Sequence, residues 1–175
     1  MSVVGLVSKP WTLWGNLLLG SLVVLAALSR EPAFATTTTS TFPVQITIQS
    51  SCTILSASTL NFGTQGVLTA AVNQTSTIAV QCTNTTPYNI GLNAGTATGA
   101  TVTTRKMTNG AATVSYALYS NAGMTTNWGN TVGTDTVAGT GNGASQSYTV
   151  FGQVPAQTTP AANTYTDTIT VTVTY

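Results

Sequence analysis

A two-residue alternation of apolar and polar side chains constrains the fold of this chain most strongly. The alternation is clearest in "YTDTITVTVTY" (165–175), where Ile169, Val171, Val173 and Tyr175 are separated by threonines. A period of two is typical of a half-buried β-strand, and threonine suits the exposed face of such a strand. No turn signal follows this strand, so the segment that pairs with it has to be sought elsewhere.

The alternation recurs along the chain in "FPVQITIQ" (42–49), "TIAVQC" (77–82), "YNIGL" (88–92), "VSYALY" (114–119) and "SYTVF" (147–151). Turn-forming stretches rich in glycine and asparagine separate these segments. Short strands with such connections predict an all-β antiparallel sandwich or barrel. Residues 123–143 are less patterned and predict a long loop, with a short edge strand in "NTVGTDTVAG" (130–139).

The first 35 residues predict an export signal rather than a part of the fold. Lys9 precedes an apolar run over residues 13–28, and Ala33-Phe34-Ala35 fits the small-x-small pattern of signal-peptidase cleavage after Ala35. The alternative is an uncleaved membrane anchor, although the run is barely as long as the ~20 residues that span a bilayer. Cleavage leaves residues 36–175, a length suited to one domain.

Beyond the predicted signal, the chain is almost uncharged. Its only charged side chains are Arg105, Lys106, Asp135 and Asp167, and the chain contains no histidine. A neutral surface provides no electrostatic attraction for nucleic acid, and it lacks the repulsion that keeps copies of a small protein apart. This composition favours a protein that packs against copies of itself. We expect Arg105 and Lys106 to be solvated or structural rather than part of a binding site.

Two cysteines, Cys52 and Cys82, are the only ones in the chain. In an exported protein an even number of cysteines predicts a disulfide, here one that closes a loop of about thirty residues and stabilises the fold by about 3–4 kcal/mol. Two thiols without histidines or clustered carboxylates are a poor ligand set, so we expect no metal and no other cofactor.

Eight segments resemble the spore coat protein U family, which includes major subunits of archaic chaperone–usher pili. In chain order they are "LNFGT" (60–64), "VQCTN" (80–84), "YNIGLNAG" (88–95), "RKMTNG" (105–110), "YALYSNAG" (116–123), "NWGN" (127–130), "YTVFGQVPAQ" (148–157) and "YTDTITVTVTY" (165–175).

The resemblance implies an incomplete immunoglobulin-like sandwich that lacks its last strand, over residues 50–175. It implies that a periplasmic chaperone lends a strand to the open groove. At an outer-membrane usher, the N-terminal segment of another subunit then replaces the chaperone strand, a form of β-augmentation. The partners implied are copies of this chain, other pilus subunits, the chaperone and the usher, and the destination is the cell surface.

We therefore expect residues 36–49 to be the donor strand, with Phe42, Val44, Ile46 and Ile48 as its apolar plugs. The edge strand of the acceptor groove would carry Ile169, Val171, Val173 and Tyr175. The alternative is that the N-terminal segment is the domain's own first strand, paired within one chain. Pro43 has no N–H, so full pairing is expected only from Val44 onward.

The function predicted is that of a structural subunit of a pilus used in adhesion and biofilm formation, and not of an enzyme. Without histidine, a serine or cysteine nucleophile has no usual base, and Asp135 and Asp167 are the only carboxylates after the signal. Two alternatives stay open. One is a secreted spore-coat or matrix structural protein, and the other is a monomeric carbohydrate-binding sandwich in which Trp128 and Tyr119 form a platform for sugars.

Overall fold

The computed structural model describes residues 32–175, so most of the predicted signal peptide lies outside the described residues. The chain divides into two units, Met1–Val44 and Gln45–Tyr175, and the second unit contains every described strand. Residues 32–51 form neither strand nor helix. Within residues 32–175 there is no helix with the length and hydropathy needed to cross a membrane.

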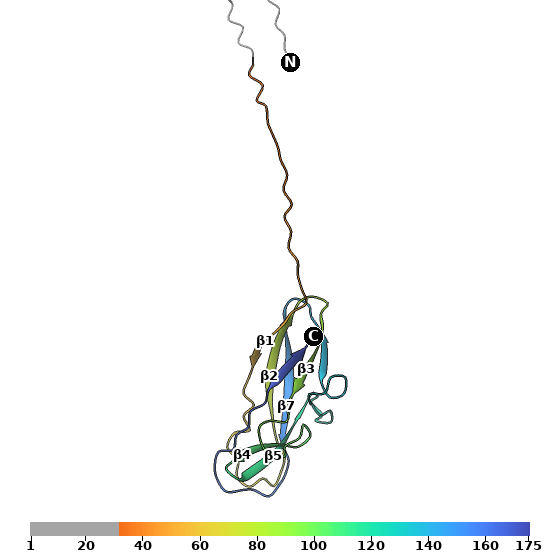
Figure 1. Cartoon of the computed structure of the whole chain (residues 1–175). Helices are drawn as coiled ribbons and strands as arrows, with labels where there is room; N and C mark the ends of the chain where they lie inside the picture. Colours follow the sequence, from red (N-terminus) through yellow and green to blue (C-terminus); the bar gives the residue numbers. More distant parts are fainter. Residues whose placement is uncertain (1–31) are drawn as a thin grey trace, which may run out of the picture. The chain divides into compact units, whose positions relative to one another are not determined.

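Two antiparallel sheets make up the unit Gln45–Tyr175 (Figure 1). The five-stranded sheet has the order β1-β2-β7-β5-β4, and the three-stranded sheet has the order β6-β3-β8. The strands are β1 (Cys52–Ala57), β2 (Val72–Cys82), β3 (Pro87–Leu92), β4 (Arg105–Asn109), β5 (Ala112–Tyr119), β6 (Val137–Thr140), β7 (Ser145–Val154) and β8 (Val171–Thr174). The predicted all-β antiparallel architecture is confirmed.

The core lies between the two sheets and is formed mainly by the apolar positions of the alternating segments, joined by Leu68, Trp128 and Val154. The buried side chains are Leu68, Ile78, Val80, Cys82, Tyr88, Ile90, Leu92, Val114, Tyr116, Leu118, Trp128, Val150 and Val154. Because successive side chains of a strand point to opposite faces, the alternate residues of β2 and β7 face outward, and apart from Ala79 and Phe151 they are serine, threonine, asparagine and glutamine.

The hairpin of β4 and β5 turns at Gly110 and Ala111, with Asn109 opposite Ala112. Gly110 has a φ of 57°, in the region that two-residue hairpin turns require and that glycine adopts without strain. The predicted edge strand in residues 130–139 is present as β6, displaced toward the C-terminus and paired with β3.

Candidate functional site at an open strand edge

Within residues 32–175, strand β8 pairs with β3 alone, through Leu92 opposite Val171 and Asn89 opposite Thr174. One of its two edges therefore has no partner in the described part of the chain. At the edge of the other sheet lies β1, whose one partner among the described strands is β2. Some Cα atoms of β1 and β8 lie within 8 Å of each other although the two strands are not paired. Two unpaired edges, one from each sheet, thus lie side by side.

The register of β8 shows which of its main-chain groups face this open edge. The N–H of Asn93 donates to the carbonyl of Thr170 at 3.2 Å, and Gly91 lies opposite Thr172. Because bonding alternates along an antiparallel ladder, Thr170, Thr172 and Thr174 direct their N–H and C=O toward β3. The N–H and C=O groups of Val171 and Val173 therefore point outward. Leu92, opposite Val171, correspondingly donates its N–H away from β8, to Gly129 at 2.8 Å.

The side chains along this edge are incompletely covered. Ile169, Val171 and Val173 are half-buried against the core, whereas Tyr175 is 60% exposed. On β1, Ile54 is 38% exposed and Leu55 48%. Of the residues expected to form the acceptor edge, Val171 and Val173 lie in β8, and Ile169 and Tyr175 flank it.

The segment expected to be the donor strand is unpaired in the described structure. Phe42, Val44, Ile46 and Ile48 have exposed fractions between 72% and 86%, and no strand is assigned to residues 36–49. Isolated apolar side chains on a protein surface need no explanation, but four at every second position form a continuous apolar stripe if the segment is extended.

The predicted disulfide joins Cys52, the first residue of β1, to Cys82, the last residue of β2. The two residues are directly opposite in the register of the strand pair. A bulge between Ile54 and Ser56 adds one residue to β1, because Ile54 lies opposite Val80 and Ser56 opposite Ala79. The disulfide thus fixes β1 on the side of the bulge where the chain enters the sheet.

Arg105 is structural and fully buried, not solvated. Its guanidinium donates to four carbonyls: those of Asn93 at 2.8 Å, Val102 at 2.6 Å, Leu92 at 2.9 Å and Trp128 at 2.7 Å. Burial lowers the pKa of Arg105 from its usual value, while Tyr116, Asp167 and Asp135 act in the opposite direction. The side chain joins the end of β3 to the loop that carries Trp128.

Three tyrosines, Tyr116, Tyr88 and Tyr148, have phenol groups in hydrogen bonds within the sandwich. Tyr116 donates to Asp167 Oδ2 at 2.7 Å, and the hydroxyls of Tyr88 and Tyr148 lie 2.6 Å apart. Burial, followed by these hydrogen bonds, raises the pKa of both Tyr116 and Tyr88 above the ordinary value. Both phenols are therefore neutral hydrogen-bonding groups.

The side-chain carboxylates of Asp135 and Asp167 accept hydrogen bonds from other residues of the fold and are not paired with each other. Asp135 Oδ1 accepts a hydrogen bond from the N–H of Thr131, and Asp167 holds Thr96 and Tyr116. Within residues 32–175, no three histidine, cysteine, aspartate or glutamate side chains gather as a metal site. Trp128 is buried and donates to the Ile90 carbonyl at 2.8 Å, so it offers no exposed face for a sugar.

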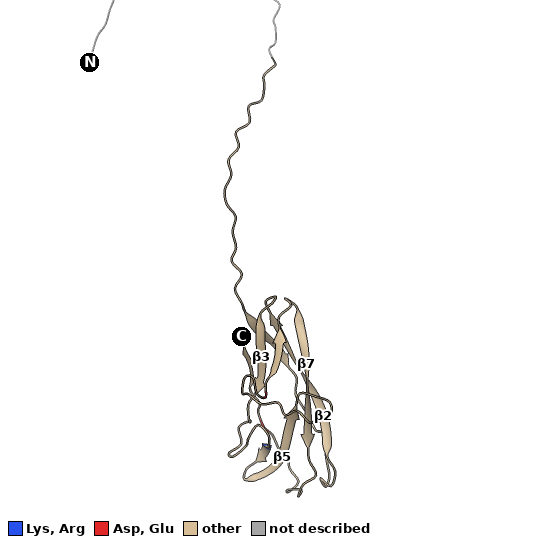
Figure 2. Ribbon diagram, turned by 90° about the vertical axis from the view of Figure 1, so that its right-hand side faces the viewer, with Lys and Arg blue, Asp and Glu red and all other residues tan. Residues whose placement is uncertain are grey.

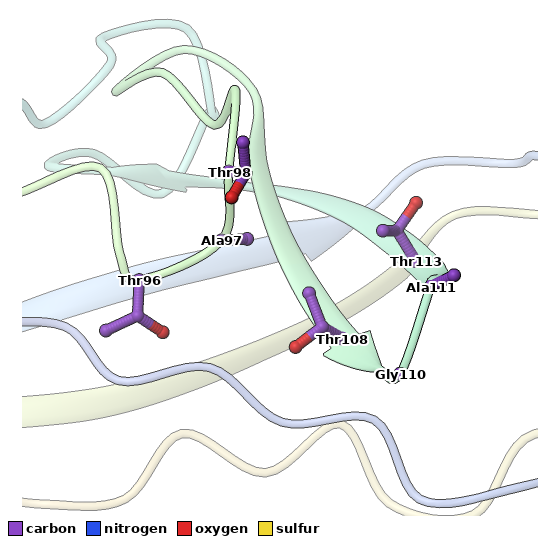
Figure 3. A pocket seen from close by; sticks show the side chains of 7 residues that line it. All are labelled: Thr96, Ala97, Thr98, Thr108, Gly110, Ala111 and Thr113. Carbon is purple, nitrogen blue, oxygen red and sulfur yellow. The ribbon is translucent and has the colours of Figure 1, made fainter.

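A pocket of about 350 Å³ lies between the loop after β3 and the β4–β5 hairpin (Figure 3). Its lining consists of threonine, alanine and glycine only, namely Thr96, Ala97, Thr98, Thr108, Gly110, Ala111 and Thr113. No aromatic or charged side chain contributes to it, so the pocket has neither a stacking surface nor an acid or base.

The comparisons with known proteins agree with this architecture. The sequence matches the family model of the Spore Coat Protein U domain over residues 38–172. Protein U of Myxococcus xanthus is 35% identical over 160 residues, which cover 83% of this chain and 89% of that protein.

One solved structure with a similar fold is the CsuC–CsuE chaperone–tip adhesion subunit pre-assembly complex from the archaic chaperone–usher Csu pili of Acinetobacter baumannii. The matched chain of this crystal structure has a TM-score of 0.53 and 28% sequence identity. The match covers 74% of the present chain but only 40% of that chain. From the family match and the curated relative together, the chain belongs to the spore coat protein U family.

Proposed function

We propose that this protein is a structural subunit of a chaperone–usher surface pilus and polymerises by donor-strand exchange. The observation that carries the proposal is the open edge of β8, where the main-chain groups of Val171 and Val173 point outward beside half-buried apolar side chains. A strand added there completes the three-stranded sheet and covers the exposed apolar surface next to β1.

The N-terminal segment has the composition that such a strand requires. Burying Phe42, Val44, Ile46 and Ile48 contributes about 1.5–3 kcal/mol for each side chain, roughly 6–12 kcal/mol in total before ordering costs. Contacts from the donor of one copy to the acceptor of the next do not close on themselves, so they generate an open filament. Pairing within one chain remains the competing arrangement for this segment, and the experiment below separates the two.

In the cell, residues 1–35 would direct export and be cleaved after Ala35, leaving residues 36–49 as donor and 50–175 as pilin domain. A periplasmic chaperone would cover the β8 edge until an outer-membrane usher exchanges it for another subunit. The proposed destination is the cell surface, and the proposed role of the fibre is adhesion and biofilm formation. The similarity to a chain of a chaperone–pilus subunit complex supports these partners.

A second candidate is a structural protein of a spore coat or secreted matrix. The description of the matching family, the Spore Coat Protein U domain, favours it. Strand exchange could build both assemblies, so immunogold labelling of vegetative cells and spores distinguishes them. Fibres on vegetative cells support the pilus, and labelling confined to the spore layer supports the coat.

The donor assignment is tested with Ile46→Asp in the exported chain, compared with Gln45→Asp. Both variants add one negative charge to the same segment, but only position 46 belongs to the apolar stripe. We expect heat-sensitive ladders on unboiled denaturing gels and thin fibres by negative-stain microscopy for Gln45→Asp, and neither for Ile46→Asp. Normal ladders and fibres from Ile46→Asp would reject the donor assignment.

A further inference from the structure

The segment that precedes β8 is held to both sheets. Thr166 and Thr108 exchange two main-chain hydrogen bonds, which attach the segment to the edge of β4 in the five-stranded sheet. Four residues later, Thr170 is bound to Asn93, directly after β3 of the three-stranded sheet. Asp167 lies between these two attachments.

Asp167 is the acceptor that joins the segment to two other parts of the fold. Its Oδ1 accepts hydrogen bonds from the N–H of Thr96 at 2.8 Å and from the Thr96 hydroxyl at 2.9 Å, and its Oδ2 accepts from Tyr116 of β5 at 2.7 Å. Gly95, with a φ of 86°, allows the loop to approach, since a Cβ at this position would overlap the Asp167 carboxylate.

Asn93 holds both main-chain groups of Thr170. Its N–H donates to the Thr170 carbonyl, and its side-chain Oδ1 accepts from the Thr170 N–H at 2.9 Å. The buried Arg105 in turn donates to the Asn93 carbonyl at 2.8 Å. Asn93 thus fixes the position of Thr170 relative to β3, and with it the register of β8. Arg105 links Asn93 to the buried interior of the domain.

We propose that Asp167 and Asn93 are positioning residues that keep β8 in register on β3 before a strand is added to its other edge. This inference rests on the strand exchange proposed above. A strand of four residues with one neighbour is short for stable pairing by itself. Its outward groups at Val171 and Val173 are aligned for an incoming strand only while β8 is ordered. The apparent affinity for that strand is therefore the intrinsic affinity multiplied by the fraction of chains in which β8 is ordered.

The test uses the full exported chain carrying Ile46→Asp, which accepts a strand but does not donate one. The probe is a synthetic peptide of residues 36–51, and its capture rate is measured by fluorescence anisotropy. Asp167→Asn is compared with Asp135→Asn, which makes the same chemical change in the loop before β6. Tyr116→Phe removes one of the three hydrogen bonds between Asp167 and the rest of the fold, and it serves as a milder second variant.

We expect Asp167→Asn to lower the capture rate roughly tenfold, because it weakens charge-assisted hydrogen bonds, and Asp135→Asn to change it less than about twofold. Hydrogen exchange should accelerate at Thr172 and Thr174 but not in β2 or β7, a selectivity that a general loss of stability would not produce. Tyr116→Phe should shift the rate and the exchange in the same direction by a smaller amount.

Equal capture rates for the Asp167 and Asp135 variants would overturn the inference, as would exchange that accelerates throughout β2 and β7. If the Ile46→Asp parent itself captures no peptide, the proposed function fails instead. The two failures are therefore distinguishable in one set of measurements.

Discussion

At the scale of single residues, Arg105 shows how a charged group can be buried without a carboxylate partner. A guanidinium has five N–H donors in a planar arrangement, and here four carbonyls from three separate segments lie around it. A lysine ammonium has only three donors on a flexible stem and does not reproduce this geometry. The neighbouring Lys106 makes no comparable set of contacts and is only half-buried.

Arg105→Lys is expected to lower the free energy of unfolding by about 2–4 kcal/mol, because at least one buried carbonyl loses its donor and the charge is less well satisfied. Lys106→Met, one position along β4, should change it by less than about 0.5 kcal/mol. Urea unfolding of the oxidised protein, followed by tryptophan fluorescence, measures both. Similar losses for the two variants would contradict the structural role of Arg105.

At the scale of secondary-structure elements, the alternation of apolar and polar side chains predicted the interior parts of β2, β3, β5 and β7. The alternation indicates both the period of the strand and the face that is buried. Strands β1 and β4 were not predicted from the sequence. The bulge at Leu55 interrupts the period of β1, and β4 carries polar side chains along an edge.

The acceptor and donor segments could be proposed from the sequence because each carries an uninterrupted apolar alternation. The hydrogen bonds of Asp167 could not be predicted from the sequence. Its partners Thr96 and Tyr116 lie 71 and 51 residues away along the chain, and only the fold brings them together. The burial of Arg105 could not be predicted either, because the sequence of the adjacent pair Arg105-Lys106 does not indicate which of the two side chains points inward.

The direction of the main-chain groups in β8 leads to a prediction about proline. Val173→Pro removes an N–H that faces the open edge, so it should leave folding intact but suppress ladder formation. Thr172→Pro removes an N–H that faces β3, so it should lower the melting temperature of the subunit. Ladder formation is measured on unboiled gels, and melting in the Ile46→Asp background. Normal ladders from Val173→Pro would show that the open edge is not used.

At the scale of the whole molecule, the sandwich contains very few charged side chains. Figure 2, in which charged residues are coloured, shows a ribbon that is tan nearly throughout. Arg105 is buried and Asp135 and Asp167 accept hydrogen bonds. In the proposed fibre, association between copies would therefore depend on apolar burial and main-chain pairing rather than on attraction between ions.

Assembly of the exported chain should consequently respond weakly to ionic strength. We expect the rate of ladder formation to change less than about threefold between 50 and 500 mM sodium chloride, because screening acts on charges that are scarce at this surface. Sodium sulfate at equal ionic strength should accelerate assembly, since it strengthens apolar burial. A decline of tenfold or more with sodium chloride would indicate a charged interface.

The disulfide between Cys52 and Cys82 has a mechanical consequence in a fibre of such subunits. Tension transmitted through the N-terminal segment reaches the domain at Cys52, the point where β1 would otherwise begin to peel from β2. The covalent bond transmits the force directly from Cys52 to Cys82, so the residues between the two cysteines cannot be pulled out into an extended chain. With a sequence separation of 30 residues, the length withheld from each subunit is about 100 Å. A reduced fibre would therefore be longer at rupture than an oxidised one.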